Sequence, residues 1–293
     1  MKKSRKKILP YALIVPSTIF ILLVVAFPIV YTFVLSFTKW DMMKSSELVF
    51  VGLGNYIKLF AKDLDFYNSL KITSIYVVST VLLEFLIGFG LALLLHNIRL
   101  KIMRVVSSIL LMPIVFVPVA VGTVWRLIFN NDAGFINEIL RFLFPNINAP
   151  MWLIDPKLAL ISVIIVDVWQ ATPFFMILIL GGLKSMPEEP FEAAIVDGAS
   201  TLQSFRYLTL HYLTPVILIA LIFRVVETFR EFDKVFMLTG SGPGGTTELI
   251  SLYAYHQSFR LYNLGYASAI AIIMLIIMGL ATWSLIRALK IEI

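Results

Sequence analysis

Cysteine is absent from the 293 residues, and charged side chains are scarce. Without a thiol the chain can form neither a disulfide framework nor a thiolate metal site. The three histidines lie far apart in the sequence and give no support to a metal site; they are His96, His211 and His256. Charged residues make up 14% of the chain and hydrophobic residues 59%. Since soluble proteins carry about 25% charged residues, this composition predicts a membrane protein.

Signatures of catalysis are missing as well. The sequence contains no Gly-x-x-x-x-Gly-Lys-Ser/Thr loop, so we do not expect this chain to hydrolyse ATP. It also has no cluster of histidine and carboxylate residues, and no nucleophile beside an evident base. We therefore expect a protein that is not an enzyme and that carries no metal or cofactor of its own.

The basic residues are placed as a membrane protein requires. A net charge of +6 would suggest nucleic acid as a partner of a soluble protein. Here five basic residues stand among the first seven, before an apolar stretch from about Ile8 to Phe37. That stretch is too long for the core of a signal peptide, and no small-residue cleavage site closes it. We interpret it as a retained first span with its lysines in the cytoplasm, and expect no nucleic acid partner.

Six segments are long and apolar enough for a transmembrane helix, which needs about 20 residues. They lie at about 10–36, 72–95, 106–129, 158–183, 214–236 and 264–288. We predict an all-α integral membrane protein with six transmembrane helices, in which residues 1–293 form a single transmembrane domain. With the basic N-terminus in the cytoplasm, connections 96–105 and 184–213 and the C-terminus are also cytoplasmic.

Connection 184–213 holds a polar, helix-like segment between two apolar spans. Pro187 and Pro190 flank two glutamates, which is typical of a helix start because acids favour the positive end of the helix dipole. The sequence Gly198-Ala199-Ser200 then predicts a turn and a new N-cap, with a second helix from Thr201. Taken alone, this pattern also fits an amphipathic hairpin resting on the membrane surface.

The same segment resembles the EAA loop of binding-protein-dependent ABC importer permeases. The family pattern is Glu-Ala-Ala, three residues, Gly, nine residues, an aliphatic residue, one residue and Leu-Pro; here it reads Glu192-Ala193-Ala194, Gly198, Leu208 and Leu210-His211. Because His211 stands where the family usually has proline, we expect a less kinked exit from the second helix. The resemblance implies a type I importer fold with a cytoplasmic coupling helix that docks on an ATPase. The implied coupling residues are Glu192, Ala193, Ala194, Asp197, Gly198 and Ala199.

Further segments resemble the carbohydrate-uptake branch of this family, the maltose-type F and glycerol-phosphate-type A permeases. They are FVGLGNYIKLF (50–60), PVAVGTVWRLIFNNDAGFIN (118–137), DVWQATPFF (167–175), FDKVFMLTGSGPGGTTELISLYAYHQSF (232–259) and LGYASAIAI (264–272). The resemblance implies a multi-pass protein of a bacterial or archaeal cytoplasmic (inner) membrane. Its implied partners are the lipid bilayer, a second homologous permease subunit, two ATPase subunits that bind ATP and Mg, and an extracellular sugar-binding protein.

Polar residues form one helical face on each of two consecutive spans, with the spacing i, i+3, i+4, i+7. The two faces are Asp167, Gln170, Ala171 and Phe174, and Arg224, Glu227, Thr228 and Glu231. Ionisable residues inside spans are costly and mark candidate pathways. In maltose-type permeases the corresponding faces hold the sugar, so the resemblance implies a substrate pathway here. Alternatively, Arg224 forms an intrahelical pair with Glu227 or binds the partner permease.

These side chains suit a sugar. Carboxylates and a carboxamide pair with vicinal hydroxyls, a guanidinium donates to sugar oxygens, and Phe174 or Trp169 can stack on an apolar sugar face. With Arg230 included, the faces hold three acids and two bases, which argues against an anionic substrate. We expect transport of a neutral di- or oligosaccharide; glycerol phosphate or a polyol, carried by the same architecture, is the alternative.

Other polar residues and prolines in the spans receive a structural interpretation. Glu84 is expected to contact another helix rather than substrate, and Pro113, Pro118 and Pro173 are expected to be kinks. Four tyrosines fit a sugar platform facing the binding protein and an interfacial aromatic belt equally well; they are Tyr253, Tyr255, Tyr262 and Tyr266.

Two other classes of membrane protein compete with this prediction. One is an ion-coupled secondary transporter that works through Asp167 or Glu84, although the sequence shows none of the internal repeats usual in such folds. The other is a membrane-embedded enzyme, which the missing catalytic signatures disfavour.

Overall fold

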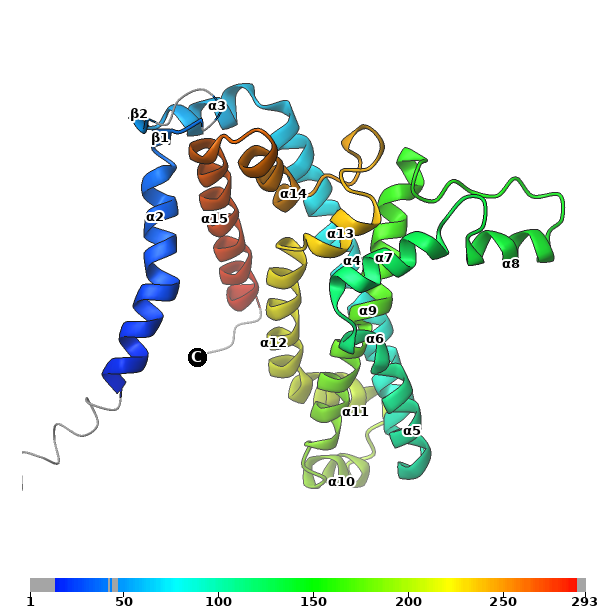
Figure 1. The fold of residues 1–293 in the computed structure, drawn as a ribbon. Helices are drawn as coiled ribbons and strands as arrows, with labels where there is room; N and C mark the ends of the chain where they lie inside the picture. Colours follow the sequence, from blue (N-terminus) through cyan, green and yellow to red (C-terminus); the bar gives the residue numbers. More distant parts are fainter. Residues whose placement is uncertain (1–13, 42, 44–46, 289–293) are drawn as a thin grey trace, which may run out of the picture. The chain divides into compact units, whose positions relative to one another are not determined.

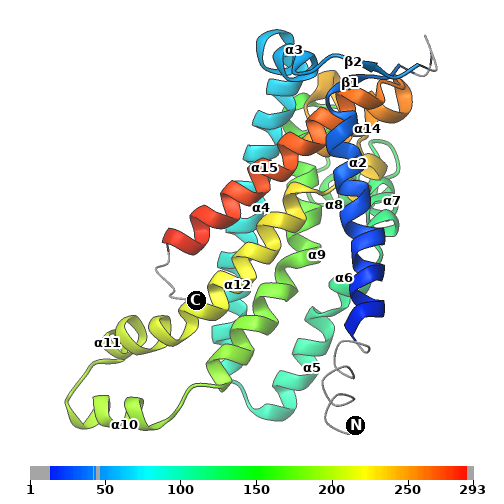
Figure 2. The same ribbon diagram turned by 90° about the vertical axis from the view of Figure 1, so that its left-hand side faces the viewer.

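The computed structural model describes residues 14–41, 43 and 47–288. Regular structure in this part of the chain is helical apart from a hairpin of two-residue strands, β1 (Thr38–Lys39) and β2 (Val49–Phe50), which pair antiparallel. The chain forms two compact units, residues 1–64 with 253–276 and residues 65–252 with 277–293. Each unit is described by itself, and its elements can be followed in Figures 1 and 2.

The first unit contains the first span and the loop that follows it. An apolar helix covers Ile14–Leu35 and includes a π-helical stretch, η1 (Leu22–Ala26), and α2 (Phe27–Leu35). After the hairpin comes α3 (Gly54–Lys62), where Asn55 donates to the carbonyl oxygens of Ser36 and Thr38, each at 2.8 Å. These bonds hold α3 against the end of α2. The helix α14 (Ile250–Tyr255) leads back into this unit, which ends with η4 (His256–Arg260) and the first part of α15 (Leu264–Ala288).

The second unit contains the longest helices. Its elements in chain order are α4 (Leu64–His96), α5 (Leu100–Leu110), α6 (Met112–Val115), α7 (Pro118–Ile128), α8 (Phe135–Leu143), α9 (Pro156–Lys184), α10 (Glu189–Val196), α11 (Thr201–Ser204), η2 (Phe205–Thr209), α12 (Leu210–Phe229), α13 (Asp233–Leu238) and η3 (Pro243–Gly245). The short helices α11, η2 and α12 follow one another without a break, so one helical rod runs over Thr201–Phe229.

Five helices in the described part of the chain are long and apolar enough to cross a membrane, against the six that the sequence predicts. They are Ile14–Leu35, Leu64–His96, Pro156–Lys184, Thr201–Phe229 and Leu264–Arg287. Residues 10–13 of the predicted first span lie outside the described residues. The fourth and last spans agree with their predicted bounds within two residues. The predicted fifth span, 214–236, is misplaced, because its helix begins at Thr201 and ends at Phe229.

The predicted third span, 106–129, is not one helix but the three pieces α5, α6 and α7. The second interruption leaves Phe116 (ψ 138°) and Val117 (ψ 133°) in extended conformation directly before Pro118. Proline disfavours the helical conformation at the residue before it and has no N–H to continue the hydrogen-bond ladder. The expected kink at Pro118 is therefore a full break in the helix, whereas near Pro113 the interrupting residue Leu111 keeps helical dihedral angles (φ −80°, ψ −14°).

The core of the second unit surrounds α9, which is the most buried of the five candidate spans. This helix begins with Asp155 as its N-cap, whose carboxylate accepts from the Lys157 amide at 2.7 Å, and it continues through Pro173. It packs against α12, α6 and α13. Gly122 on α7 lets α13 approach closely, because an added Cβ would lie 2.8 Å from the carbonyl oxygen of Lys234. These contacts bring α13 onto the polar face of α9.

Candidate substrate pathway and coupling loop

Six of the eight residues predicted for the substrate pathway line one cavity of about 360 Å³ in the second unit. The full lining is Ile114, Phe116, Pro118, Gln170, Ala171, Phe174, Arg224, Glu227, Glu231 and Lys234. The two other predicted residues, Asp167 and Thr228, do not line the cavity and are buried in the protein, with 1% and 0% of their surface exposed. The structure therefore brings the two polar faces together around one space.

Arg224 ties three helices of this site together. Its Nε and Nη2 donate to the two carboxylate oxygens of Glu84 on α4, both at 2.7 Å. Its Nη1 donates to Glu227 Oε2 at 2.9 Å, and its Nη2 lies 3.4 Å from Asp167 Oδ2 on α9. The prediction that Glu84 contacts another helix is confirmed, and the intrahelical pair between Arg224 and Glu227 is also present. A bidentate pair of this kind fixes the positions of both helices.

Lys234 on α13 belongs to the same cluster and was missed in the sequence. Its Nζ forms ion pairs with Asp167 and, at 3.1 Å, with Glu231. The hydroxyl of Tyr76 donates to the second carboxylate oxygen of Asp167 at 2.7 Å. One signal was available, because Lys234 stands three residues after Glu231 and so continues the helical spacing of the predicted face. The predicted spans gave no indication that Asp167 would be its partner.

Both cations in the cavity lining are paired with acids. The cluster holds four carboxylates (Glu84, Asp167, Glu227 and Glu231) and two cations (Arg224 and Lys234). Buried charges are tolerated only when they are paired and hydrogen-bonded. The carboxylate of Glu227 is the most accessible of these groups, with 57% of its side chain exposed, whereas the side chain of Arg224 is 4% exposed. The cavity therefore presents an accessible acceptor and no free cation from the described residues.

Gln170 offers a second acceptor. Its Nε2 donates to the carbonyl oxygen of Phe116 at 2.8 Å, a carbonyl that lies in the break of the third span. Its Oε1 is buried and finds no hydrogen-bond partner in the part of the chain that the structure describes. A buried polar atom without a partner is rare in native proteins and needs an explanation such as a ligand or water. Thr228 Oγ1 is also buried without a described partner, but it lies outside the cavity lining.

The loop between α9 and α12 folds as its sequence predicts at the turn. Gly198 has a positive φ of 77°, its amide donates to Ile195 O at 3.1 Å, and the amide of Ala199 donates to Ala194 O at 2.9 Å. This is the Schellman ending of a helix, which favours glycine. Ser200 then caps α11 reciprocally with Gln203, with bonds of 3.3 and 2.7 Å.

The second helix of this loop differs from the expected short helix. It does not end near the loop but continues to Phe229, with the π-helical stretch η2 just before Leu210 and His211. A proline at position 211 would lack the amide that continues the helical ladder. The continuous helix agrees with the expectation of a less kinked exit.

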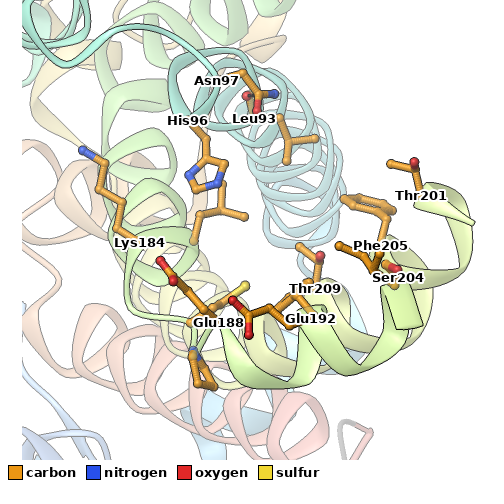
Figure 3. Close-up of a pocket in the computed structure, with 15 residues that line it drawn as sticks. Leu93, His96, Asn97, Lys184, Glu188, Glu192, Thr201, Ser204, Phe205 and Thr209 are labelled. Atoms are coloured by element: carbon orange, nitrogen blue, oxygen red, sulfur yellow. Dashed lines mark hydrogen bonds between the residues drawn. The ribbon is translucent and has the colours of Figure 1, made fainter. Parts of the chain in front are cut away.

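A second cavity, of about 690 Å³, lies under this loop between α10, α11 and the ends of α4 and α9 (Figure 3). Glu192 lines it together with Glu188 and His96, and Figure 3 shows these side chains around the same space. Neither glutamate forms an ion pair within the described residues. The other predicted coupling residues (Ala193, Ala194, Asp197, Gly198 and Ala199) do not line this cavity. Beside them, Ile195 and Val196 are 73% and 87% exposed.

Two of the four tyrosines proposed as a sugar platform are buried in the first unit instead. The hydroxyls of Tyr253 and Tyr266 both donate to Asp63 Oδ2, the first at 2.5 Å. Burial, together with the hydrogen bond to Asp63, raises the pKa of the Tyr253 phenol. Tyr266 also lies under the ammonium of Lys58, which is 4.2 Å from its ring centroid. These two rings have no free face for a sugar, so that interpretation is wrong for them.

Comparisons with known proteins place the chain among transport proteins. Residues 84–290 match the model of the family described as binding-protein-dependent transport system inner membrane component. The chain is 39% identical over 282 residues to a probable ABC transporter permease protein, y4oQ, of Sinorhizobium fredii, covering 94% of this chain and 90% of that protein. It is 36% identical over 271 residues to the trehalose/maltose transport system permease protein MalF of Thermococcus litoralis, covering 92% and 90%.

One solved structure has the same fold over the full length. It is a chain of a bacterial alginate ABC transporter in complex with an alginate pentasaccharide-bound periplasmic protein. The two chains superpose with a TM-score of 0.85 at 21% identity, and the match covers 100% of this chain and 99% of that one. At this identity the likeness concerns the fold alone.

Proposed function

The chain belongs to the family of binding-protein-dependent transport system inner membrane components, and on this premise we propose that it forms half of the path by which a neutral di- or oligosaccharide enters the cell. As a member of this family it is a multi-pass transport permease and not an enzyme, with the type I ABC importer permease fold. The relative from Thermococcus litoralis is named for trehalose and maltose, which are neutral disaccharides.

The observation that carries the choice of a neutral substrate is the pairing of both cations in the cavity. Arg224 is engaged by Glu84 and Glu227, and Lys234 by Asp167 and Glu231. An anionic substrate would have to displace a carboxylate from one of these two buried cations, which is costly. A neutral sugar leaves the pairs intact. This argument also disfavours the alternative of glycerol phosphate, while it leaves a polyol open.

Three groups in the lining can hold such a sugar. Gln170 lines the cavity and its Oε1 is a buried acceptor without a partner among the described residues, so a sugar hydroxyl would satisfy it once the side chain turns this oxygen toward the cavity. The exposed carboxylate of Glu227 accepts a second hydroxyl. Phe174 lies in the same lining and supplies an apolar face for ring stacking. In this proposal Asp167 and Thr228, which are buried outside the cavity lining, stabilise the site and do not touch the sugar.

The proposed assembly follows from the family and from the coupling loop. We place a second homologous permease beside this chain, two ATPase subunits carrying ATP and Mg on the cytoplasmic side, and an extracellular sugar-binding protein on the other. The exposed apolar pair Ile195 and Val196 gives α10 a surface for the ATPase. This arrangement puts both termini in the cytoplasm and the protein in the inner membrane.

The chain offers a direct mechanical link from the ATPase to the sugar. The helix α10 is joined to α9 by four residues, and through the turn at Gly198 to the continuous rod Thr201–Phe229. Gln170 is on α9, and Arg224 and Glu227 are on that rod. ATP-driven closure of the ATPases would therefore move both walls of the cavity through one loop. Closure of the ATPases opens the cavity to the extracellular side, and ATP hydrolysis returns it to a state open to the cytoplasm.

The test is to express the chain with its neighbouring genes, purify it by an affinity tag and identify what co-purifies. The proposal predicts a second permease and an ATPase, with one ATPase for each permease subunit. ATPase activity should then rise with the binding protein and one neutral sugar from a panel. Stimulation by an anionic sugar alone would overturn the substrate class. If the chain purifies alone and drives uptake with an ion gradient, it is a secondary transporter and the whole proposal is wrong.

A further inference from the structure

The nine-residue helix α8 (Phe135–Leu143) has its polar side held inward and its apolar side outward. Asn137 is fully buried, and its side-chain nitrogen lies 3.2 Å from Asn131 O and 3.3 Å from Pro150 O. Its side-chain oxygen accepts from the indole of Trp152 at 2.8 Å. These bonds fasten one face of α8 to the loop on either side of it.

Arg141 fixes the same orientation from a second position. Its guanidinium donates to the carbonyl oxygens of Asp132 at 2.8 Å and Asn131 at 2.9 Å. It also pairs with Glu138 at 2.6 Å, so the two charged residues of the helix neutralise each other. The helix is therefore clamped by its polar residues and cannot turn its apolar side inward without breaking several hydrogen bonds.

The outward side consists of large apolar residues that touch little of the described chain. Phe142 is 84% exposed, which makes it one of the most exposed large apolar residues of the protein. The other members of this surface, which we call the α8 apolar face, are Phe135 (66%), Ile139 (42%), Leu143 (58%) and the following Phe144 (57%). The α8 apolar face contains no charged residue. Contiguous apolar surfaces of this kind mark contacts with a membrane or another protein.

The helix α8 stands between two apolar helices of the chain. It follows α7 and precedes α9, and Figure 1 shows it out to the side of α9, on the part of that helix remote from the coupling loop. With 29 residues, α9 is about 43 Å long, and the hydrocarbon core of a bilayer is only about 30 Å thick, so at least one end of α9 extends into the headgroup region. The helix α8 contacts α7, whose apolar residues Val124 and Leu127 are also 53% and 67% exposed.

We propose that α8 lies in the membrane–water interface and buries the α8 apolar face among the lipid headgroups and upper acyl chains. Nine residues are too few to span the bilayer, but an amphipathic helix of this length can lie in its plane. A lipid occupant is favoured over a soluble protein because the face carries no charge and α8 stands in the chain between α7 and the membrane-spanning α9. The inward polar clamp gives the helix a fixed rotation, so that Phe142 points to lipid.

The absence of cysteine allows a direct test with single-cysteine spin labels. Phe142→Cys on α8 and the matched control Asp132→Cys in the preceding loop both replace exposed side chains, and neither side chain takes part in the polar clamp. Each variant is labelled in the assembled transporter, reconstituted in nanodiscs of phosphatidylcholine and phosphatidylglycerol. The accessibility of each label to oxygen, which partitions into lipid, is compared with its accessibility to a water-soluble nickel chelate. Sugar uptake by the labelled transporter in liposomes is measured in parallel.

We expect the ratio of oxygen to nickel accessibility to be several-fold higher at position 142 than at position 132. Equal ratios, with both labels open to nickel, would overturn the proposal, because α8 would then lie in water. A label at 142 that neither reagent reaches would show that protein covers the face. Protection of 142 that appears only when the binding protein is added would assign the face to that protein.

A second reporter keeps the test decisive if a cysteine variant assembles poorly. In Phe142→Trp, we expect bromine atoms placed high on the acyl chains to quench more fluorescence than in the parent protein; no additional quenching would contradict the proposal. Both labelled variants could lose uptake while the ratio of oxygen to nickel accessibility is as expected. That result would contradict the transport assay or the proposed function, and the placement of α8 would stand.

Discussion

The buried charge cluster and the coupling loop show two ways in which one chain uses polar residues. In the cluster, Arg224 and Lys234 are nearly inaccessible and each is bound to two or more carboxylates of the same chain. In the loop, Glu188 and Glu192 have no ion pair within the described residues, and the neighbouring Val196 is 87% exposed. The cluster is complete within one chain, whereas the loop leaves acidic and apolar side chains exposed, where a partner can reach them.

This difference separates residues that stabilise the chain from residues that serve its partners. Removing a buried member of the cluster leaves a buried charge unpaired, so the effect should appear first in stability. A substitution in the loop leaves no buried charge without a partner, so its effect should appear first in the rate of transport. The predictions below test this separation.

The largest effect is expected from Arg224→Met. It leaves the buried carboxylate of Glu84 without its bidentate partner, and breaking a buried pair costs about 3–5 kcal/mol. We expect a large fall in yield and in melting temperature in detergent. The matched control is Arg230→Met, six residues further on, where the side chain is exposed and the melting temperature should not change. A stable Arg224→Met protein would show that the cluster is not needed for folding.

Gly198→Pro should abolish ATP-driven uptake without a comparable loss of stability. The native φ of 77° is closed to proline, whose ring holds φ near about −65°, so the turn between α10 and α11 must rearrange. Uptake into liposomes and the melting temperature are measured on the same preparation. Gly181→Ala, in the last turns of α9 with open space around it, is the control and should transport normally. Normal uptake by Gly198→Pro would exclude this loop from coupling.

Gly122→Ala should damage the charge cluster from a distance. The added Cβ would lie 2.8 Å from the carbonyl oxygen of Lys234 and so push α13 away from α7. Overpacking of this kind costs about 1–3 kcal/mol, and we expect a lower melting temperature and weaker sugar stimulation of the ATPase. At Gly90, where an added Cβ meets nothing within 4 Å, alanine should be tolerated or slightly stabilising.

Glu227→Gln should have the smallest effect on stability and a selective effect on substrate. The carboxylate is 57% exposed and lines the cavity, so removing its charge leaves no buried group unpaired. Exchanging a charged for a neutral hydrogen bond to a hydroxyl is worth about 1.4 kcal/mol, or a tenfold loss of sugar affinity. The sugar concentration that gives half-maximal stimulation of the ATPase measures this loss of affinity. Glu189→Gln on the coupling loop is the control. Unchanged stimulation by every sugar would make Glu227 a structural residue.

The local features of the fold were open to prediction from the sequence. The fourth span, predicted at 158–183, is the helix Pro156–Lys184, because a long apolar run between Asp155-Pro156 and a lysine leaves few alternatives. The turn at Gly198 and the cap at Ser200 were predicted for the same reason, since each depends on residues within one turn of itself. The helical spacing of the two polar faces also placed six residues correctly around one cavity.

Contacts between distant residues were not open to prediction in this way. Glu84 and Arg224 are 140 positions apart, and a lone glutamate in an apolar span does not identify its partner. The partner of Lys234 was not open to prediction, because the structure ends the predicted fifth span at Phe229 and begins a separate helix, α13, at Asp233, in which Lys234 pairs with Asp167 of α9. The third span was predicted as one apolar helix, and Pro118 breaks this helix instead of bending it.

The sequence by itself determined that this chain spans a membrane, that α10 and α11 meet at a glycine, and that two spans carry polar faces. Each of these depends on hydropathy or on hydrogen bonds within a few residues, which a linear pattern records. Only the tertiary structure decided that both cations of the cavity are neutralised and that Gln170 Oε1 has no hydrogen-bond partner among the residues that the structure describes. The energy of a buried charge depends on which groups surround it, and here those groups come from α4, α9, α12 and α13 at once.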